Sequence, residues 1–223
     1  PDLHLGHTVV LRKLKEFQDL GHKIIFIIGD YTGMIGDPSG KSAIRNQLTL
    51  KEVSENAKTY LKQVSRVIDI KKAEIRYNGE WFKNMKFSEI INLTSKFTAQ
   101  RILERDDFTK RLKEGVPLGT HELLYPIMQA YDSIMVKADV EIGGTDQKFN
   151  MLAGRRLQEK MGLPPQDIIT TPLLIGLDGK SKMSKSLDNY IGITESAENM
   201  FGKIMSIPDN LIIQYFEFLT DFS

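Results

Sequence analysis

The sequence predicts an α/β fold built on a doubly wound parallel sheet, and three observations support this prediction. Residues 8–20 have the apolar spacing of an amphipathic helix. Residues 24–28 form a continuous β-branched and aromatic run, which is typical of a strand buried on both faces. That run ends at a glycine-rich loop, and the order helix, strand, glycine-rich loop is characteristic of open α/β sheets.

The remaining elements follow from apolar periodicity and from glycine and proline positions. Further helices are expected at residues 49–66, 86–133 and 146–161. Further strands are expected at residues 67–70, 75–77, 134–142 and 168–174. Helices resume beyond Thr194, with Pro208 separating two of them. The expected architecture is therefore a parallel sheet with a helical segment in its middle and a helical region at its end.

Composition excludes several classes of protein. The chain has 223 residues, of which 41% are hydrophobic, and this supports a sizeable core. The net charge of +1 gives no global indication of nucleic-acid binding. The absence of cysteine excludes disulfides and thiolate zinc sites. No apolar run approaches the ~18 residues of a membrane helix, and no signal peptide opens the chain, so a cytoplasmic protein is expected.

The beginning and the end of the chain both predict a fragment. The first motif starts at His4, whereas a nucleotide-contacting turn normally follows a strand. The aromatic-rich helix near Ser223 has an apolar face that needs a partner. We therefore expect a missing strand before the chain and a further domain after it.

Two motifs far apart in the sequence indicate a bound nucleotide. The first reads HLGH and places the imidazoles of His4 and His7 beside Gly6, where a ligand can approach the backbone closely. The second reads KMSKS and brings Lys182 and Lys185 onto one short loop, suited to the charge of a leaving pyrophosphate. Each motif alone is weak, because short matches occur by chance and a Lys/Ser run is usually a solvated loop. The pair, in this order, indicates activation by ATP.

A glycine-rich loop follows the first predicted strand and carries an acidic side chain. Four glycines within residues 29–40 permit close approach of the backbone. Asp37 lies on this loop beyond the carboxyl end of the strand, where ligands bind in open α/β sheets. The alternative is a plain turn, since Asp-Pro-Ser-Gly is a good turn sequence.

Two further polar clusters are candidates for a ligand site. Tyr125, Gln129 and Asp132 are spaced i, i+4 and i+7, so a helix places them on one face. Their segment contains neither Lys nor Glu, which favours a small polar ligand over an ordinary solvated face. In the second cluster, Gly144 lets a sugar approach a helix N-terminus, and Asp146 either accepts from a ribose hydroxyl or simply caps the helix.

Together these residues resemble the motifs of class I aminoacyl-tRNA synthetases, and within that class the bacterial-type tyrosyl-tRNA synthetases. HLGH and KMSKS resemble the two class signatures, and three tyrosine-specific motifs are matched at residues 36–41, 129–132 and 143–147. The resemblance covers the whole chain. It implies a Rossmann-like catalytic fold that activates L-tyrosine with ATP to tyrosyl-adenylate and pyrophosphate, and then transfers tyrosine to tRNA(Tyr).

The resemblance also implies a role for each matched residue. The α-ammonium group of tyrosine would be held by Asp37, Tyr125 and Gln129. The phenolic hydroxyl would bond to Asp132, and the same pocket would be lined by Gln147. The adenosine would contact Gly6, Gly144 and Asp146. The phosphates would meet His4 and His7, and the leaving pyrophosphate would be stabilised by Lys41, Arg45, Lys182 and Lys185.

A domain organisation and partners are implied as well. Residues 1–190 would form the catalytic domain, with a helical insertion at about residues 80–125 that supplies a homodimer interface. Residues 191–223 would begin a helical domain, and an anticodon-binding domain would lie beyond the chain. Four aromatic residues of the insertion serve either that interface or the core: Trp81, Phe82, Phe87 and Phe97. Mg²⁺ is expected with ATP, without a protein ligand that the sequence can name.

Three alternatives stay open. A tryptophanyl-tRNA synthetase would share the fold and both signatures, although the motifs at 129–132 and 143–147 favour tyrosine. A small-molecule adenylyltransferase would lack the KMSKS sequence. A non-catalytic RNA-binding paralogue would have lost pocket residues, whereas this chain retains those that can be checked.

Overall fold

The structure is a computed structural model that describes residues 3–35 and 50–222. The chain forms two compact units, and each is described here by itself. The first unit consists of Pro1–Ile24, Asn56–Glu74 and Thr171–Ser223. The second unit consists of Ile25–Glu55 and Ile75–Thr170.

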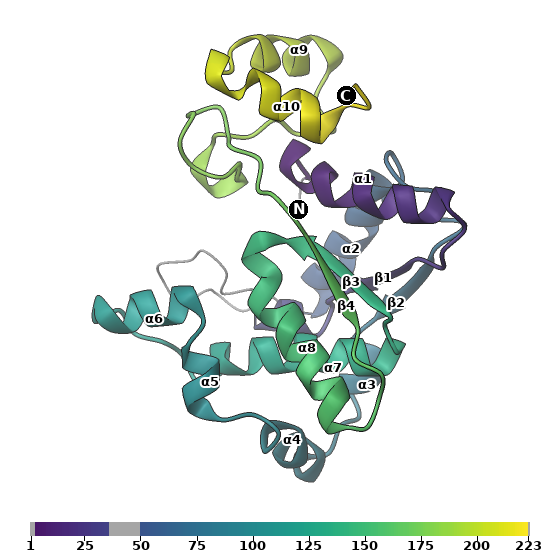
Figure 1. Cartoon of the computed structure of the whole chain (residues 1–223), viewed down its shortest axis with the longest axis vertical. Helices are drawn as coiled ribbons and strands as arrows, with labels where there is room; N and C mark the ends of the chain where they lie inside the picture. Colours follow the sequence, from purple (N-terminus) through teal and green to yellow (C-terminus); the bar gives the residue numbers. More distant parts are fainter. Residues whose placement is uncertain (1–2, 36–49, 223) are drawn as a thin grey trace. The chain divides into compact units, whose positions relative to one another are not determined.

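The first unit is built around helices from both ends of the chain. Its helices include α1 (Leu5–Asp19), most of α2 (Leu50–Val64), α9 (Ala197–Met205) and α10 (Ile212–Leu219), and α1 packs beside α10 (Figure 1). Gly21 follows α1 with φ +86, a left-handed conformation that favours glycine and ends the helix. The core of the unit contains Val9, Leu174, Met183, Ile191, Leu211 and Tyr215. Residues 9 and 183 therefore share one core, although they are far apart in the sequence.

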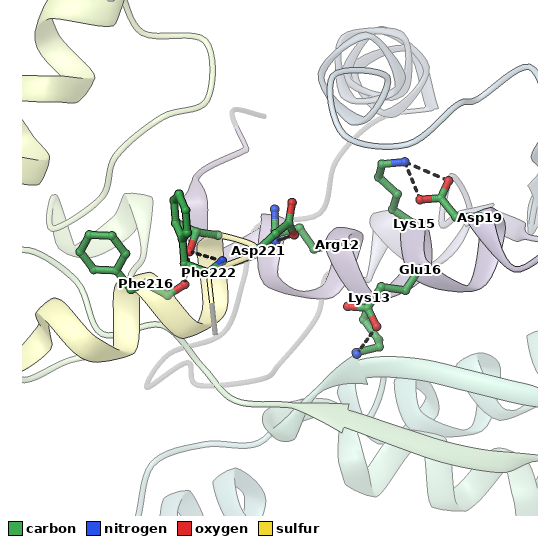
Figure 2. Close-up of polar contacts among 9 residues, drawn as sticks. Arg12, Lys13, Lys15, Glu16, Asp19, Phe216, Asp221 and Phe222 are labelled. Atoms are coloured by element: carbon green, nitrogen blue, oxygen red, sulfur yellow. Dashed lines mark hydrogen bonds and ion pairs between the residues drawn. The ribbon is translucent and has the colours of Figure 1, made fainter.

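Ion pairs cover the exposed side of α1 (Figure 2). Arg12 pairs with Asp221, which lies after α10, and this contact joins the two helices at the surface. Lys15 and Asp19 pair within the helix at 2.7 Å and at the favourable i,i+4 spacing. These pairs are exposed, so they solubilise the helix more than they stabilise it.

The strands of the second unit run parallel, as the sequence predicts. Strands β1 (Ile25–Ile28) and β2 (Glu74–Tyr77) form one pair. The N–H of Glu74 donates to the carbonyl of Ile24, and the N–H of Asn78 donates to Ile28. In both bonds the donor follows the acceptor by the same number of residues, and this constant difference requires parallel strands. Strands β3 (Val140–Gly144) and β4 (Asp167–Thr171) form the other pair, and a bond from Asp167 to Asp139 joins their first ends.

Helices make up most of the rest of the second unit. They are α3 (Gly79–Phe82), α4 (Phe87–Thr94), α5 (Ala99–Leu103), α6 (Asp106–Lys113), α7 (Tyr125–Val136) and α8 (Lys148–Lys160). Helices α7 and α8 lie side by side (Figure 1). The core cluster includes Phe108, Ile127, Ala130, Ile134 and Leu157. The positions predicted for α2 (Leu50–Val64) and for the helices after residue 194 are also confirmed.

Two predicted strands are wrong. Residues 67–70 form turns, in which Asp69 exchanges hydrogen bonds with the side chain of Gln18. Ile68 is buried there, so the short apolar run supplies a core residue without a strand. The strand expected at residues 134–142 starts only at Val140, because α7 continues to Val136 and ends at Lys137 with φ +51.

The four aromatic residues of the predicted insertion have different environments. Trp81 and Phe82 are buried, which confirms the core alternative for these two. Phe97 is half-buried and packs against the core, whereas Phe87 is 76% exposed on α4. A search of the described helices finds none that is long and apolar enough to cross a membrane.

Candidate active site

The first signature is held in place by backbone pairing in the first unit. His4 forms an antiparallel bridge with Gly192 and immediately precedes α1. The N–H of Leu5 donates to Ile191 at 3.0 Å, and the N–H of Ile193 donates to Leu3 at 3.0 Å. This short ladder fixes the start of α1 and with it the backbone of His4.

The two histidines of the signature contact each other. Their ring centroids lie 3.9 Å apart, and the N–H of His4 donates to Nδ1 of His7 at 3.2 Å. An imidazole that accepts at Nδ1 carries its proton on Nε2, so Nε2 of His7 is a hydrogen-bond donor. His7 is exposed, and this donor suits an anionic ligand.

The fold brings the two signatures together at Gly6. A Cβ atom at this position would lie 3.0 Å from Nδ1 of His4 and 3.5 Å from Cβ of Met183. The first distance is too tight for an ordinary side chain, so a glycine lets the His4 ring lie across the start of α1. Met183 is the second residue of KMSKS, and the motifs predicted to act together are therefore neighbours.

The KMSKS loop is anchored at several points. Met183 is 4% exposed, and its N–H donates to Leu174 at 2.7 Å. Asn189 is buried and ties the loop to itself, because its Oδ1 accepts from the N–H of Ser184 and its Nδ2 donates to the carbonyl of Lys182. Lys185 lies exposed on the short turn η4 (Lys185–Leu187), so a rigid base presents an exposed ammonium group.

Burial and positive neighbours keep His4 neutral. His4 is 7% exposed, and burial is the largest cause that lowers its pKa from 6.5 to about 3, with smaller contributions from His7 and Lys182. The influence of Lys182 on His4 again links the two signatures electrostatically. Nδ1 of His4 is buried and has no hydrogen-bond partner in the part of the chain that the structure describes.

In the second unit, the predicted polar stripe lies on α7. Asp132 is 8% exposed, and both of its carboxylate oxygens accept hydrogen bonds. Oδ1 accepts from the indole N–H of Trp81 at 2.9 Å, and Oδ2 accepts from Nδ2 of Asn78 at 3.3 Å. A carboxylate has about four lone-pair sites, so these two bonds orient Asp132 and leave acceptor capacity for a ligand.

The pKa of Asp132 is raised from 3.8 to about 7. Burial is the largest cause, and it exceeds the opposing effect of the hydrogen bonds from Trp81 and Asn78. The carboxylates of Glu141 and Asp30 raise the pKa further. A buried aspartate with a pKa near neutrality is a candidate functional residue, because the pKa of most aspartates lies well below this range.

Gln129 lies one turn before Asp132 and belongs to a second network. Its Nε2 donates to Glu141 at 3.2 Å, and its Oε1 accepts from Nδ2 of Asn150 at 2.8 Å. The same Nδ2 of Asn150 donates to Oε1 of Gln147 at 3.0 Å. Two predicted site residues, Gln129 and Gln147, are therefore joined through Asn150, which is 1% exposed.

The other predicted residues of this unit lie on neighbouring elements. Tyr125 is half-buried at the first position of α7. Gly144 is buried at the end of β3, and Asp146 is half-buried in the turn η3 (Thr145–Gln147) that precedes α8. Three predicted residues lie outside the described residues: Asp37, Lys41 and Arg45.

The structure adds residues that the sequence did not single out for the site. They are Asn78, Glu141, Asn150 and Asn189, together with Trp81 in its role as a hydrogen-bond donor to Asp132. No periodic pattern in the sequence marks these residues for the site. Within residues 3–35 and 50–222, no cluster of three His, Asp or Glu side chains could hold a metal ion.

Comparison with known proteins places the chain in a family. All residues from 1 to 223 match the family described as tRNA synthetases class I (W and Y). A tyrosine–tRNA ligase of Thermotoga maritima is 58% identical over 221 residues, and tyrosine–tRNA ligase 2 of Clostridium acetobutylicum is 59% identical. These alignments cover 99% of this chain but 55% of each relative, so the chain spans about half the length of the curated relatives it matches.

Solved structures agree with this assignment of the fold. A tyrosyl-tRNA synthetase of Archaeoglobus fulgidus, crystallised with L-tyrosine, is 25% identical and superposes with a TM-score of 0.78 over 98% of this chain and 68% of that one. The enzyme of Aeropyrum pernix is 19% identical with a TM-score of 0.77, over 98% of this chain and 66% of that one. The α/β fold with parallel strands is thus confirmed, and the chain belongs to the class I tRNA synthetases of the tryptophan and tyrosine group.

Proposed function

We propose that this protein is a tyrosine–tRNA ligase of the cytoplasm. It activates L-tyrosine with ATP, which arrives with Mg²⁺, and then transfers tyrosine to tRNA(Tyr). The observation that carries the proposal is the contact of the two signatures, in which Gly6 packs beside Met183. The names of relatives at 58% and 59% identity support tyrosine as the amino acid.

The first unit supplies the groups that act on ATP. The carboxylate of tyrosine attacks the α-phosphorus, a P–O bond forms, and the bond to pyrophosphate breaks. The resemblance to the family assigns adenosine contacts to Gly6, Gly144 and Asp146. Nε2–H of His7 donates to a phosphate oxygen and His4 assists in the transition state, while the leaving pyrophosphate is stabilised by Lys41, Arg45, Lys182 and Lys185. No protein nucleophile is needed, because charge stabilisation and positioning lower the barrier, by about 3–4 kcal/mol for a well-placed donor.

The second unit supplies the groups that select tyrosine. Asp132 accepts a hydrogen bond from the phenolic hydroxyl, and its orientation by Trp81 and Asn78 supports this role. The α-ammonium group is held by Asp37, Tyr125 and Gln129, and the same pocket is lined by Gln147. Phenylalanine would leave Asp132 without its partner, and an unpaired buried polar group costs about 1–3 kcal/mol.

The alternatives are less well supported. The polar network around Asp132 and Gln129 gives an acceptor for a phenolic hydroxyl, and the motifs at residues 129–132 and 143–147 match those of tyrosine-specific enzymes. A non-catalytic paralogue has no use for a tightly anchored KMSKS loop beside His4. Both observations favour catalysis with tyrosine.

Pyrophosphate exchange tests the proposal directly. The protein as the cell makes it should incorporate labelled pyrophosphate into ATP when tyrosine is present, and much less when tryptophan or phenylalanine replaces tyrosine. Exchange that depends on tryptophan would establish the first alternative. Absence of exchange with any amino acid would overturn the enzyme proposal.

We also propose a homodimer and the domain organisation that the resemblance implies. Residues 1–190 form the catalytic domain and residues 191–223 begin a helical domain. Helix α4 exposes Phe87 and Ile91 within the helical segment, and apolar side chains on one exposed helix support an interface there. Sedimentation equilibrium should give the mass of a dimer, and a monomer at micromolar concentration would contradict this part of the proposal.

A further inference from the structure

Among the residues that the structure describes, the carboxylate of Glu141 has no cationic partner. Glu141 lies on β3 and is half-buried. It accepts hydrogen bonds from Nε2 of Gln129, Oγ of Ser133 and Nε2 of Gln166. All three donors are neutral side chains, so within residues 3–35 and 50–222 the negative charge is solvated by dipoles and is not compensated by an ion pair.

Glu141 determines how the amide of Gln129 is turned. Nε2 of Gln129 donates to Oε1 of Glu141 at 3.2 Å, and this places Oε1 of the amide on the opposite side, where Asn150 donates to it at 2.8 Å. A flipped amide would set its oxygen against the carboxylate and its nitrogen against the NH₂ group of Asn150. Both contacts would be repulsive, so only one orientation is stable.

This orientation suits a cationic ligand. A carbonyl oxygen has two lone pairs, and Asn150 occupies one of those on Gln129. The second lone pair can accept from an ammonium group. A carboxylate that accepts from the N–H side of an amide polarises it and makes its oxygen a stronger acceptor.

We propose that Glu141 is a positioning residue for the α-ammonium group of the amino-acid substrate. Its hydrogen bond with Nε2 of Gln129 orients Oε1 of Gln129 toward the substrate. Its negative charge polarises the amide and makes that oxygen a stronger acceptor. The inference rests on the proposed function, in which Gln129 binds this ammonium group. Burial raises the pKa of Glu141, and the hydrogen bonds from Gln129, Gln166 and Ser133 oppose that rise only in part.

A purely structural role is the competing explanation, because Glu141 also joins β3 to α7 through Ser133 and to the β4 side through Gln166. The two explanations differ in ligand dependence. A positioning role affects only ligands that carry an ammonium group. A structural role affects every ligand of the pocket.

The test compares tyrosine with 3-(4-hydroxyphenyl)propionate, which lacks only the ammonium group. Inhibition constants and KM values are measured in pyrophosphate exchange for the unaltered protein and for Glu141→Gln. We expect the preference for tyrosine over the des-amino compound to fall about tenfold in the variant, with kcat nearly unchanged, because a charge-assisted hydrogen bond is replaced by a neutral one. Affinity for the des-amino compound should stay the same.

Ser133→Ala is the matched control. It removes another hydrogen bond to Glu141 but keeps the charge and the contact with Gln129, so the preference should stay near that of the unaltered protein. Equal weakening of both ligands by Glu141→Gln would overturn the inference while leaving the proposed function intact. Failure of the unaltered protein to use tyrosine at all would instead overturn the proposed function.

A second variant decides the question if Glu141→Gln does not fold. Glu141→Asp keeps the charge but withdraws it by one methylene from Gln129, and the preference should then fall to an intermediate value. A preference equal to that of the unaltered protein would overturn the inference. Circular dichroism at each step establishes that the variants are folded.

Discussion

His4 of the first unit and Asp132 of the second are both buried ionisable groups, and burial changes their pKa values in opposite directions. The pKa of His4 falls to about 3, whereas the pKa of Asp132 rises to about 7, because burial favours the neutral form of each. Their hydrogen bonding also differs. Asp132 accepts from Trp81 and Asn78, while Nδ1 of His4 has no partner in the described part of the chain.

Under the proposed function, this difference corresponds to different roles for the two units. The second unit orients Asp132 in advance through Trp81 and Asn78, so under the proposed function it provides a preorganised acceptor for the ligand. The first unit leaves a polar atom unsatisfied beside a loop rich in lysine, and such a group gains a partner only when a ligand binds. We therefore expect mutations in the first unit to affect the rate, and mutations in the second to affect specificity.

The largest effect is expected for Lys185→Ala. Under the proposed function, this exposed ammonium group stabilises leaving pyrophosphate, so its removal should slow adenylate formation about 10²- to 10³-fold, as for other transition-state donors. Tyrosine affinity should change little. Rapid-quench measurement of a single turnover gives the rate, and equilibrium titration gives the affinity.

Lys180→Ala provides the control, since Lys180 is an exposed lysine of the same loop that has no proposed role. Its single-turnover rate should match that of the unaltered protein. An unchanged rate in Lys185→Ala would contradict the assignment of Lys185, and equal losses in both variants would indicate a general effect of loop charge.

A smaller effect is expected for Asp132→Ala. Its loss should reduce the preference for tyrosine over phenylalanine about 10- to 100-fold, because the buried acceptor that penalises phenylalanine is gone. The ratio of kcat/KM values for the two amino acids measures this preference. Asp167→Ala removes an exposed carboxylate of the same unit and should leave the ratio unchanged.

The Asp132 assignment fails if the preference survives in Asp132→Ala. Trp81 is the single tryptophan of the chain and donates to Asp132, so its fluorescence reports whether the variant pocket is intact. A variant with an altered emission spectrum but a retained preference would place the discrimination elsewhere in the pocket.

Local periodicity predicted the residues of the candidate site that lie on α7. It did not predict the residues that contact them from other elements. The spacing of Tyr125, Gln129 and Asp132 gave their common helix face, because a helix repeats every 3.6 residues. The partners of Asp132 are Asn78 and Trp81, which are more than fifty residues away. Tertiary packing selects such partners, so no local pattern in the sequence encodes them.

The errors in the fold have a related cause. The strand expected at residues 67–70 is a buried turn, and the one expected at 134–142 begins late because Ile134 packs in the core as part of α7. In both cases a short apolar run is equally compatible with a strand, a turn or a helix end. The run at residues 24–28 was correctly assigned because it is rich in β-branched and aromatic residues and ends at a glycine, and the helix at 8–20 because its apolar periodicity extends over several turns.

The smallest expected effect is on stability. The free energy of unfolding should depend on pH through both His4 and Asp132, with opposite signs. Between about pH 4 and pH 6.5, the unfolded chain protonates His4 while the folded chain does not, so this group makes the protein less stable as the pH falls. From about pH 4 to pH 7, the folded chain holds a proton on Asp132 that the unfolded chain has lost. That group therefore makes the protein less stable as the pH rises.

His4→Gln and Asp132→Asn should separate these opposing contributions. Relative to the unaltered protein, His4→Gln should gain free energy of unfolding as the pH falls below 6.5, and Asp132→Asn should gain it as the pH rises from about 4 to 7. Each slope should approach about 1.4 kcal/mol per pH unit, the value for one proton. Urea unfolding followed by circular dichroism measures both. All other titrating groups are the same in the three proteins. If the difference in free energy of unfolding between variant and unaltered protein changed with pH in the same direction for both variants, burial would not shift the two pKa values in opposite directions.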